Sequence, residues 1–200
     1  MIRTRTPGRL LALAGALVGA LPSVRAQDLP PTRRAIQAAA GAGVHAGREE
    51  KGLGLLFALG YEQDLGARAR WRLNPQLVYG EFSSAGITDT RDQFYRTTAA
   101  GVALHYDVLK YRALAVVVSA GGFVTYARGL LGTGGELQPV GPGSRYFSHF
   151  YGSASAGLGL RVSPAGSRLA YEVRPLTLHG GSAGFALGYA TAGLALQLNK

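Results

Sequence analysis

Residues 67–79 alternate strictly between apolar and polar side chains. Successive side chains of a β-strand point to opposite faces, so this period predicts one long amphipathic strand. One face carries Ala67, Ala69, Trp71, Leu73, Pro75, Leu77 and Tyr79, and the other carries Arg68, Arg70, Arg72, Asn74 and Gln76. The fold must therefore provide an apolar environment for one face of this strand.

Seven further segments repeat the strand pattern, and they leave no segment that could form a covering layer. The eight predicted strands are 36–48, 53–64, 67–82, 95–108, 112–127, 146–163, 167–179 and 184–199. A wall that is apolar outside and polar inside is typical of a barrel surrounded by lipid. Small residues at the inward positions suit a narrow barrel that its own side chains fill. The sequence predicts an all-β fold, an eight-stranded antiparallel up-and-down transmembrane β-barrel.

The N-terminal segment has the layout of a secretory signal peptide. Three arginines precede an apolar run at residues 10–21, and Ala26 ends a segment suited to cleavage. The run is shorter than the roughly 20 residues that a membrane helix needs, which disfavours an uncleaved anchor. We expect a signal peptide at 1–26, a short lead at 27–35 and a barrel domain at 36–200.

The basic charge of the chain does not predict a nucleic-acid partner. The formal charge is +10, and removal of residues 1–26 takes away four arginines and no acid. The remaining arginines do not cluster on a helix, and no recognition motif is present. Basic side chains of an exported barrel are expected in the lumen or near anionic lipid head groups.

Long and short connections largely alternate between the predicted strands. The short ones, at 65–66, 109–111 and 163–166, contain turn residues or only a few positions. Two long polar or Gly/Pro-rich loops lie at 83–94 and 128–145. This alternation is typical of barrels with periplasmic turns and external loops, so the two loops are the expected contacts for any surface ligand.

With this strand count, alternation and loop pattern, the chain resembles the small OmpA-like and OmpX-like barrels, the "outer membrane β-barrel protein" group. The resemblance covers the whole chain and rests on no single motif. It implies the outer membrane of a Gram-negative bacterium. It also implies contacts with outer-membrane lipid, lipopolysaccharide and the barrel insertion machinery. The last strand ends in Leu198-Asn199-Lys200, without the terminal aromatic residue that is usual in such families.

Charged residues at inward positions predict a polar network inside the lumen. Its expected members are Glu62, Asp64, Arg68, Arg70, Arg72, Asp107, Arg161, Glu172 and Arg174. Buried charges must be paired or hydrated. We favour a structural polar plug, because eight strands leave little open space. The alternative is a narrow, anion-leaning pore.

The sequence favours a protein that is not an enzyme and needs no cofactor. The best nucleophile–base candidate is His149 with Ser148, Ser153 or Ser155, but no suitably spaced acid accompanies it. His45, His105 and His179 lack metal-ligand spacing.

The expected role is therefore structural or surface-interacting. Three alternatives remain open: a narrow porin-like channel, a soluble periplasmic lipocalin-like carrier with its apolar face inside, and a lipid-modifying outer-membrane enzyme.

Overall fold

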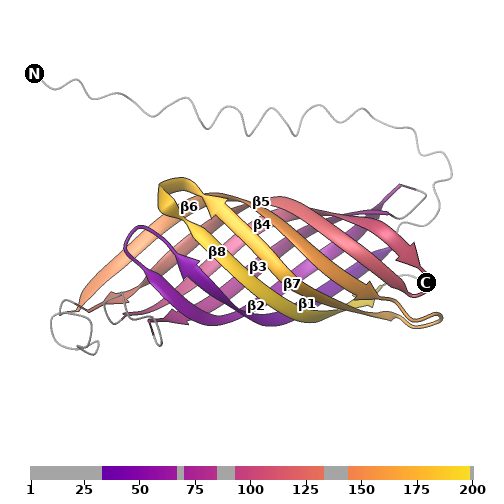
Figure 1. Ribbon diagram of the computed structural model, residues 1–200, viewed down its shortest axis with the longest axis horizontal. Coiled ribbons are helices and arrows are strands. Elements are labelled where there is room, and N and C mark those ends of the chain that lie inside the picture. The colour runs from indigo at the N-terminus through magenta and orange to yellow at the C-terminus, as the bar shows by residue number, and fades with distance from the viewer. Residues whose placement is uncertain (1–32, 67–69, 85–92, 133–143, 199–200) are drawn as a thin grey trace, which may run out of the picture.

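A computed structural model describes residues 33–66, 70–84, 93–132 and 144–198. Eight antiparallel strands form a closed barrel in which each strand pairs with its sequence neighbours and β1 also pairs with β8 (Figure 1). The strands are β1 (Arg34–Ala46), β2 (Lys51–Leu65), β3 (Trp71–Ser83), β4 (Gln93–Tyr111), β5 (Leu114–Leu131), β6 (Arg145–Val162), β7 (Leu169–Gly181) and β8 (Ala186–Gln197). The predicted eight-stranded up-and-down barrel is confirmed.

The strands place their faces as the alternation predicts. On β2, the side chains of Leu55, Phe57 and Leu59 are 60%, 53% and 56% exposed, whereas Glu62 is buried. The same alternation runs along all eight strands. Closure satisfies the backbone hydrogen bonds of every strand and leaves no sheet edge. The apolar surface therefore faces outward, and polar groups enter the lumen.

The structure differs from the predicted strand boundaries at both long connections and at the predicted short connection 109–111, which belongs to β4 and pairs with β5. β5 continues to Leu131, so residues 128–131 are strand rather than loop. Each added residue finds a partner on β4 or β6, and these ladder hydrogen bonds extend the hairpins beyond the predicted ends. Most of the two predicted loops, at 85–92 and 133–143, lies outside the described residues, as do 67–69.

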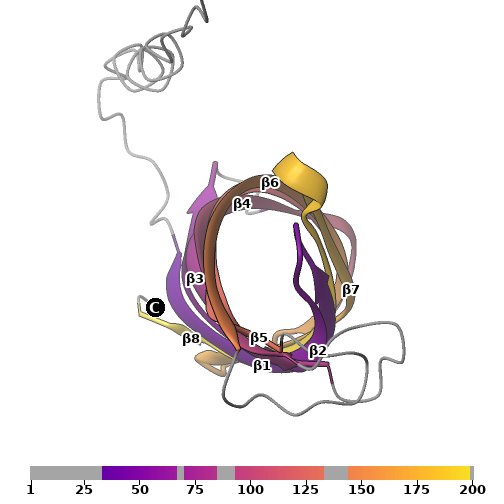
Figure 2. The ribbon, with the colours of Figure 1, turned by 90° about the vertical axis from the view of Figure 1, so that its left-hand side faces the viewer.

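The two ends of the barrel differ in their connections (Figure 1). We call one end the turn end, because it carries the β2–β3, β4–β5 and β6–β7 connections. The other, here called the loop end, carries the β1–β2, β3–β4, β5–β6 and β7–β8 connections, including the short 3₁₀ turn Ser182–Gly184. Figure 2 views the barrel from the loop end and shows the strands as a closed ring. No helix in the described residues is long and apolar enough to cross a membrane.

Glycines make room for aromatic rings inside this narrow ring. A Cβ atom at Gly80 would overlap the Phe82 ring, and one at Gly101 would overlap the Phe123 ring. Both phenylalanine side chains are buried in the lumen. Glycine at these inward positions lets large side chains fill a barrel of only eight strands.

Candidate functional site

A cluster of ion pairs fills the lumen toward the turn end. The Glu62 carboxylate accepts hydrogen bonds from Arg161 Nη1 at 2.6 Å and from Arg72 Nη1 at 3.4 Å. Arg72 Nη2 also donates to Asp107 Oδ1 at 2.7 Å. These four residues come from β2, β3, β4 and β6, and all are at most 8% exposed. The cluster therefore ties together strands that lie apart around the ring.

Glu172 and Arg174 of β7 complete the cluster. Arg174 Nε donates to Glu172 Oε1 at 2.6 Å, and Arg161 Nη1 lies 3.4 Å from Glu172 Oε2. Three arginines thus face three carboxylates, and each carboxylate contacts at least one guanidinium. Such mutual pairing offsets the high cost of removing each charge from water. We call these six residues, Glu62, Arg72, Asp107, Arg161, Glu172 and Arg174, the charge cluster.

The structure brings together six of the nine residues predicted for the lumen network. Asp64 is half-buried beside the cluster and interacts electrostatically with Arg72 and Arg33. Arg70 does not belong to the network: it is exposed and precedes the first residue of β3. The Arg70 carbonyl accepts a hydrogen bond from the Asp107 amide at 2.9 Å, so its backbone is paired with β4 and its exposed side chain lies at the open turn end. Arg68 lies outside the described residues.

The predicted network did not include three polar side chains that surround the cluster. Asn74 Nδ2 donates to Gln37 Oε1 at 2.7 Å, and Arg174 Nη2 lies 3.4 Å from the same oxygen. His105 is fully buried, with Nδ1 at 3.5 Å from Glu62 Oε1. All three residues occupy inward positions of their strands. For predicting the members of the lumen network, uncharged residues at inward positions were therefore as informative as charged ones.

The loop-end half of the lumen is aromatic, so the predicted plug of polar and charged side chains describes only part of the interior. Phe82 and Tyr95 stack with ring centroids 5.4 Å apart, and Phe147 meets Tyr95 edge-on at 5.8 Å. The Tyr95 hydroxyl lies 2.9 Å from His45 Nδ1. Tyr151, Phe185, Leu187 and other buried apolar residues belong to the same group. We call this group the aromatic plug.

Glu50 closes the plug at the loop end. It lies in the β1–β2 turn, yet it is only 1% exposed. Its carboxylate accepts a hydrogen bond from the Tyr151 hydroxyl at 2.5 Å and one from the Glu49 amide at 3.1 Å. A carboxylate can be buried this deeply because these two donors supply hydrogen bonds to its oxygens. The turn is thereby fixed across the lumen opening.

The predicted nucleophile–base candidate does not assemble in the described residues. His149 Nε2 and Ser153 Oγ are both buried without a hydrogen-bond partner, so they do not bond to each other. Ser148 is exposed, whereas Ser155 is half-buried in the lumen beside His179 on the neighbouring strand. No group of three or more potential metal ligands occurs among the residues that the structure describes.

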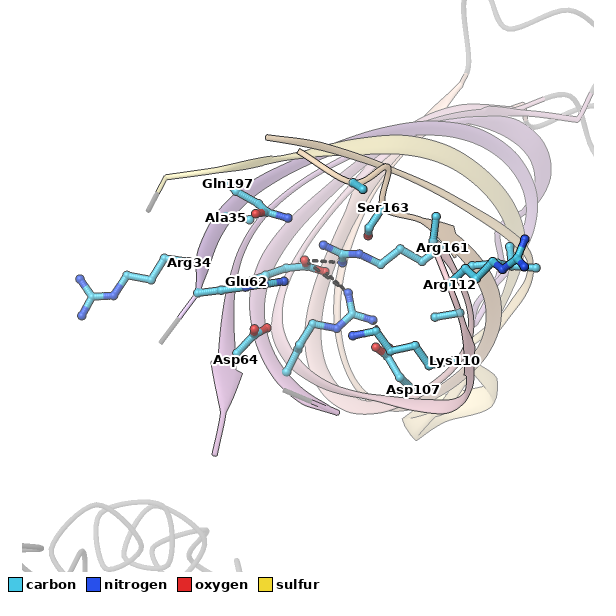
Figure 3. A pocket seen from close by; sticks show the side chains of 16 residues that line it. Arg34, Ala35, Glu62, Asp64, Asp107, Lys110, Arg112, Arg161, Ser163 and Gln197 are labelled. Carbon is cyan, nitrogen blue, oxygen red and sulfur yellow. Dashed lines mark hydrogen bonds and ion pairs between the residues drawn. The ribbon is translucent and has the colours of Figure 1, made fainter. Parts of the chain in front are cut away.

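A pocket of about 410 Å³ opens at the turn end, above the charge cluster. Figure 3 looks into this pocket, where Glu62, Asp107 and Arg161 are buried, Asp64 is half-buried and Lys110 is exposed. We call this pocket the vestibule. The aromatic plug occupies the lumen on the loop-end side of the vestibule.

The outer surface carries aromatic residues near both ends of the strands. Toward the turn end, Trp71 and Tyr106 face each other across β3 and β4 with ring centroids 4.4 Å apart. Toward the loop end, Tyr126 stacks on Phe150 at 4.6 Å. Aromatic rings favour the head-group level of a bilayer. The two aromatic groups therefore mark the two edges of the apolar outer surface.

Two arginines lie two residues beyond Tyr126 and its partner Thr98, toward the loop end. Arg96 and Arg128 are directly opposite on β4 and β5, and both side chains are exposed. Arg96 Nε contacts the Glu81 carboxylate at 3.0 Å, which in turn accepts the Tyr79 hydroxyl at 2.7 Å. Like charges directly opposite on neighbouring strands are destabilising unless something neutralises them. Among the described residues, Glu81 forms an ion pair with Arg96, and no second carboxylate pairs with Arg128.

No known family model matches the sequence, and no curated protein matches it. The fold resembles solved outer-membrane barrels. Neisserial surface protein A is 10% identical with a TM-score of 0.57, over 82% of this chain and 96% of that one. Ail, the attachment invasion locus protein of Yersinia pestis, is 11% identical with a TM-score of 0.54, over 83% and 98%. A major outer membrane protein from Thermus thermophilus is 12% identical with a TM-score of 0.53, over 84% and 100%. At these identities, the comparison establishes the shared fold.

Proposed function

We propose that this chain, which has the fold of small eight-stranded outer-membrane barrels, is an integral outer-membrane protein of a Gram-negative bacterium. Its role is structural or surface-interacting, and residues 1–26 serve as the signal peptide for export. The continuous apolar exterior carries the proposal. Exposed patches of this extent are rare on soluble monomers, and a lipid bilayer is the environment that covers them.

The same observation disfavours a soluble lipocalin-like carrier. Such a carrier holds an apolar ligand inside its barrel and presents polar residues to water. Here Leu55 and Phe57 face outward, and charged side chains occupy the lumen. The proposed closed lumen likewise disfavours a narrow porin-like channel, because the charge cluster and the aromatic plug lie in series. We propose no catalytic role, since His149 and the nearby serines do not form a hydrogen-bonded pair.

An arginine scan along β4 tests the membrane location. Val102 is the middle residue of β4 and faces outward, whereas outward-facing Phe94 lies near its loop end. Val102→Arg is expected to destabilise the barrel by about 2–4 kcal/mol in phospholipid vesicles, and Phe94→Arg by about 0–1 kcal/mol. Urea unfolding, monitored by tryptophan fluorescence, measures the stability of both variants. Equal effects of the two substitutions, or release of the protein without detergent, would contradict the proposed membrane location.

The proposed partners follow from this location. Residues 83–94 and 128–145 would contact any surface ligand, because loops on rigid scaffolds commonly carry recognition. The insertion machinery for barrels would assemble the protein. Outer-membrane lipid and lipopolysaccharide would surround it, with the Arg96–Arg128 pair facing phosphate groups at the head-group level. Guanidinium groups bind phosphate by paired, charge-assisted hydrogen bonds.

Removing the Arg96–Arg128 pair tests the lipid contact. Arg96→Gln/Arg128→Gln is expected to lose most of the stabilisation that lipopolysaccharide gives the wild-type barrel over phosphatidylcholine, about 1 kcal/mol for each arginine. Unfolding temperatures in the two lipids measure it. Arg34→Gln/Arg112→Gln removes the same charge at the turn end and serves as the control. If both double variants respond alike to lipopolysaccharide, the pair is not the contact.

A further inference from the structure

The floor of the vestibule is electrically balanced. Glu62 and Asp107 line it, and both carboxylates already bind Arg72, while Glu62 also binds Arg161. Neither carboxylate is left to neutralise further cations. The charge of the vestibule is therefore decided by the residues nearer its mouth.

The mouth is strongly basic. Arg33, Arg34, Lys110 and Arg112 line it, and Asp64 is the acidic lining residue that remains beyond the floor. None of these four cations forms an ion pair with any residue that the structure describes. Six cationic side chains and three carboxylates line the vestibule in total, an excess of three positive charges.

The cations differ in where they point. Figure 3 shows Lys110 reaching into the vestibule on the side of Asp107, whereas Arg34 extends away from the barrel. The Arg112 guanidinium lies over the Tyr111 ring, 5.2 Å from its centroid. The Arg33 carbonyl accepts a hydrogen bond from the Asp64 amide at 3.0 Å, which places Arg33 beside Asp64 in the vestibule wall. Lys110 and Arg33 are thus the cations best placed to meet a ligand, with Arg34 and Arg112 adding to the field at the entrance.

An unused donor lies deeper in the same space. Arg72 lines the vestibule and is 3% exposed, and its Nε atom has no hydrogen-bond partner. A buried guanidinium nitrogen without an acceptor is costly unless water or a ligand supplies one. An anion in the vestibule would bring acceptor oxygens toward this donor.

We propose that the vestibule binds a small multivalent oxyanion that enters from the turn end. Arginine and lysine donors suit phosphate and carboxylate oxygens, and a concave site with low-dielectric walls concentrates counter-ions. A pocket of about 410 Å³ falls in the size range of small-molecule sites. The same chemistry is offered by a free polyanion and by the phosphate of a lipid head group. This site is independent of the loops and of the Arg96–Arg128 pair at the opposite end.

Calorimetric titration of the refolded barrel with sodium pyrophosphate tests the proposal. In a zwitterionic detergent at low salt, the wild type is expected to bind one pyrophosphate, and Arg33→Gln/Lys110→Gln to bind it about tenfold more weakly. Arg48→Gln/Lys51→Gln removes the same charge at the loop end and is expected to bind like the wild type. Ser163→Phe, which narrows the mouth without changing charge, is expected to abolish binding.

The outcomes identify the source of the anion and decide whether the vestibule is a binding site. If phosphatidylglycerol in the micelle competes with pyrophosphate, the natural ligand is a lipid head group, and if it does not, the ligand is a soluble anion. Absence of saturable binding, or equal weakening in both double variants, would overturn the site. The heat-dependent gel shift of a closed barrel, run on each sample, shows that the protein is folded. The membrane proposal is tested separately by the Val102 and Phe94 variants.

Discussion

Glu62→Ala is expected to destabilise the barrel by about 3–5 kcal/mol, because it leaves buried cations without their shared carboxylate. Glu62 is 2% exposed and contacts Arg161, Arg72 and His105. After the substitution, Asp107 and Glu172 must balance three arginines. Urea unfolding in phospholipid vesicles, with tryptophan fluorescence as the readout, measures the loss.

Glu81→Ala provides a matched control on the neighbouring strand. Glu81 also pairs with an arginine, but the Glu81 and Arg96 side chains are 43% and 51% exposed. Exposed pairs contribute about 0–1 kcal/mol, so the control should lose at most that amount. A loss in Glu62→Ala no larger than in Glu81→Ala would mean that water in the vestibule replaces the carboxylate, and that the charge cluster does not hold the strands together.

Tyr95→Ala is expected to cost about 3–5 kcal/mol and to open the loop-end half of the lumen. Tyr95 is fully buried and packs against Phe82, Phe147 and His45. Its loss removes the centre of the aromatic plug and leaves a cavity that the rigid barrel wall does not close. Unfolding measurements give the stability change, and planar-bilayer recordings show whether ion flow increases over the wild type.

Tyr95→Phe separates packing from hydrogen bonding at the same position. It keeps the ring but removes the hydroxyl that meets His45 Nδ1 at 2.9 Å. The expected cost is about 1–2 kcal/mol, the penalty for leaving one buried polar atom unpaired. Conductance should stay at the wild-type level in this variant. If the alanine variant is as stable as the phenylalanine variant, the aromatic plug does not contribute through packing.

The alternation in the sequence predicted the strands and their two faces well, but it did not locate the strand ends. Phe82 and Tyr95 both occupy inward positions, and the predicted strands ended and began at these residues. Extending the same alternation through the strand interiors places both rings in the lumen. Arg70 differs because it lies at the open turn end, where its side chain is exposed rather than enclosed by the lumen.

By itself, the sequence determined that this chain forms a barrel with an apolar exterior, because a period of two assigns every side chain to one of two faces. It also determined that charge must enter the lumen. Only the tertiary structure decided which charges meet: Glu62 and Arg161 are 99 positions apart and lie at 2.6 Å. Their meeting depends on the register of every strand pair and on closure between β1 and β8. The division into a charged half and an aromatic half arises the same way, because position along the barrel axis follows from strand tilt and register, which alternation does not encode.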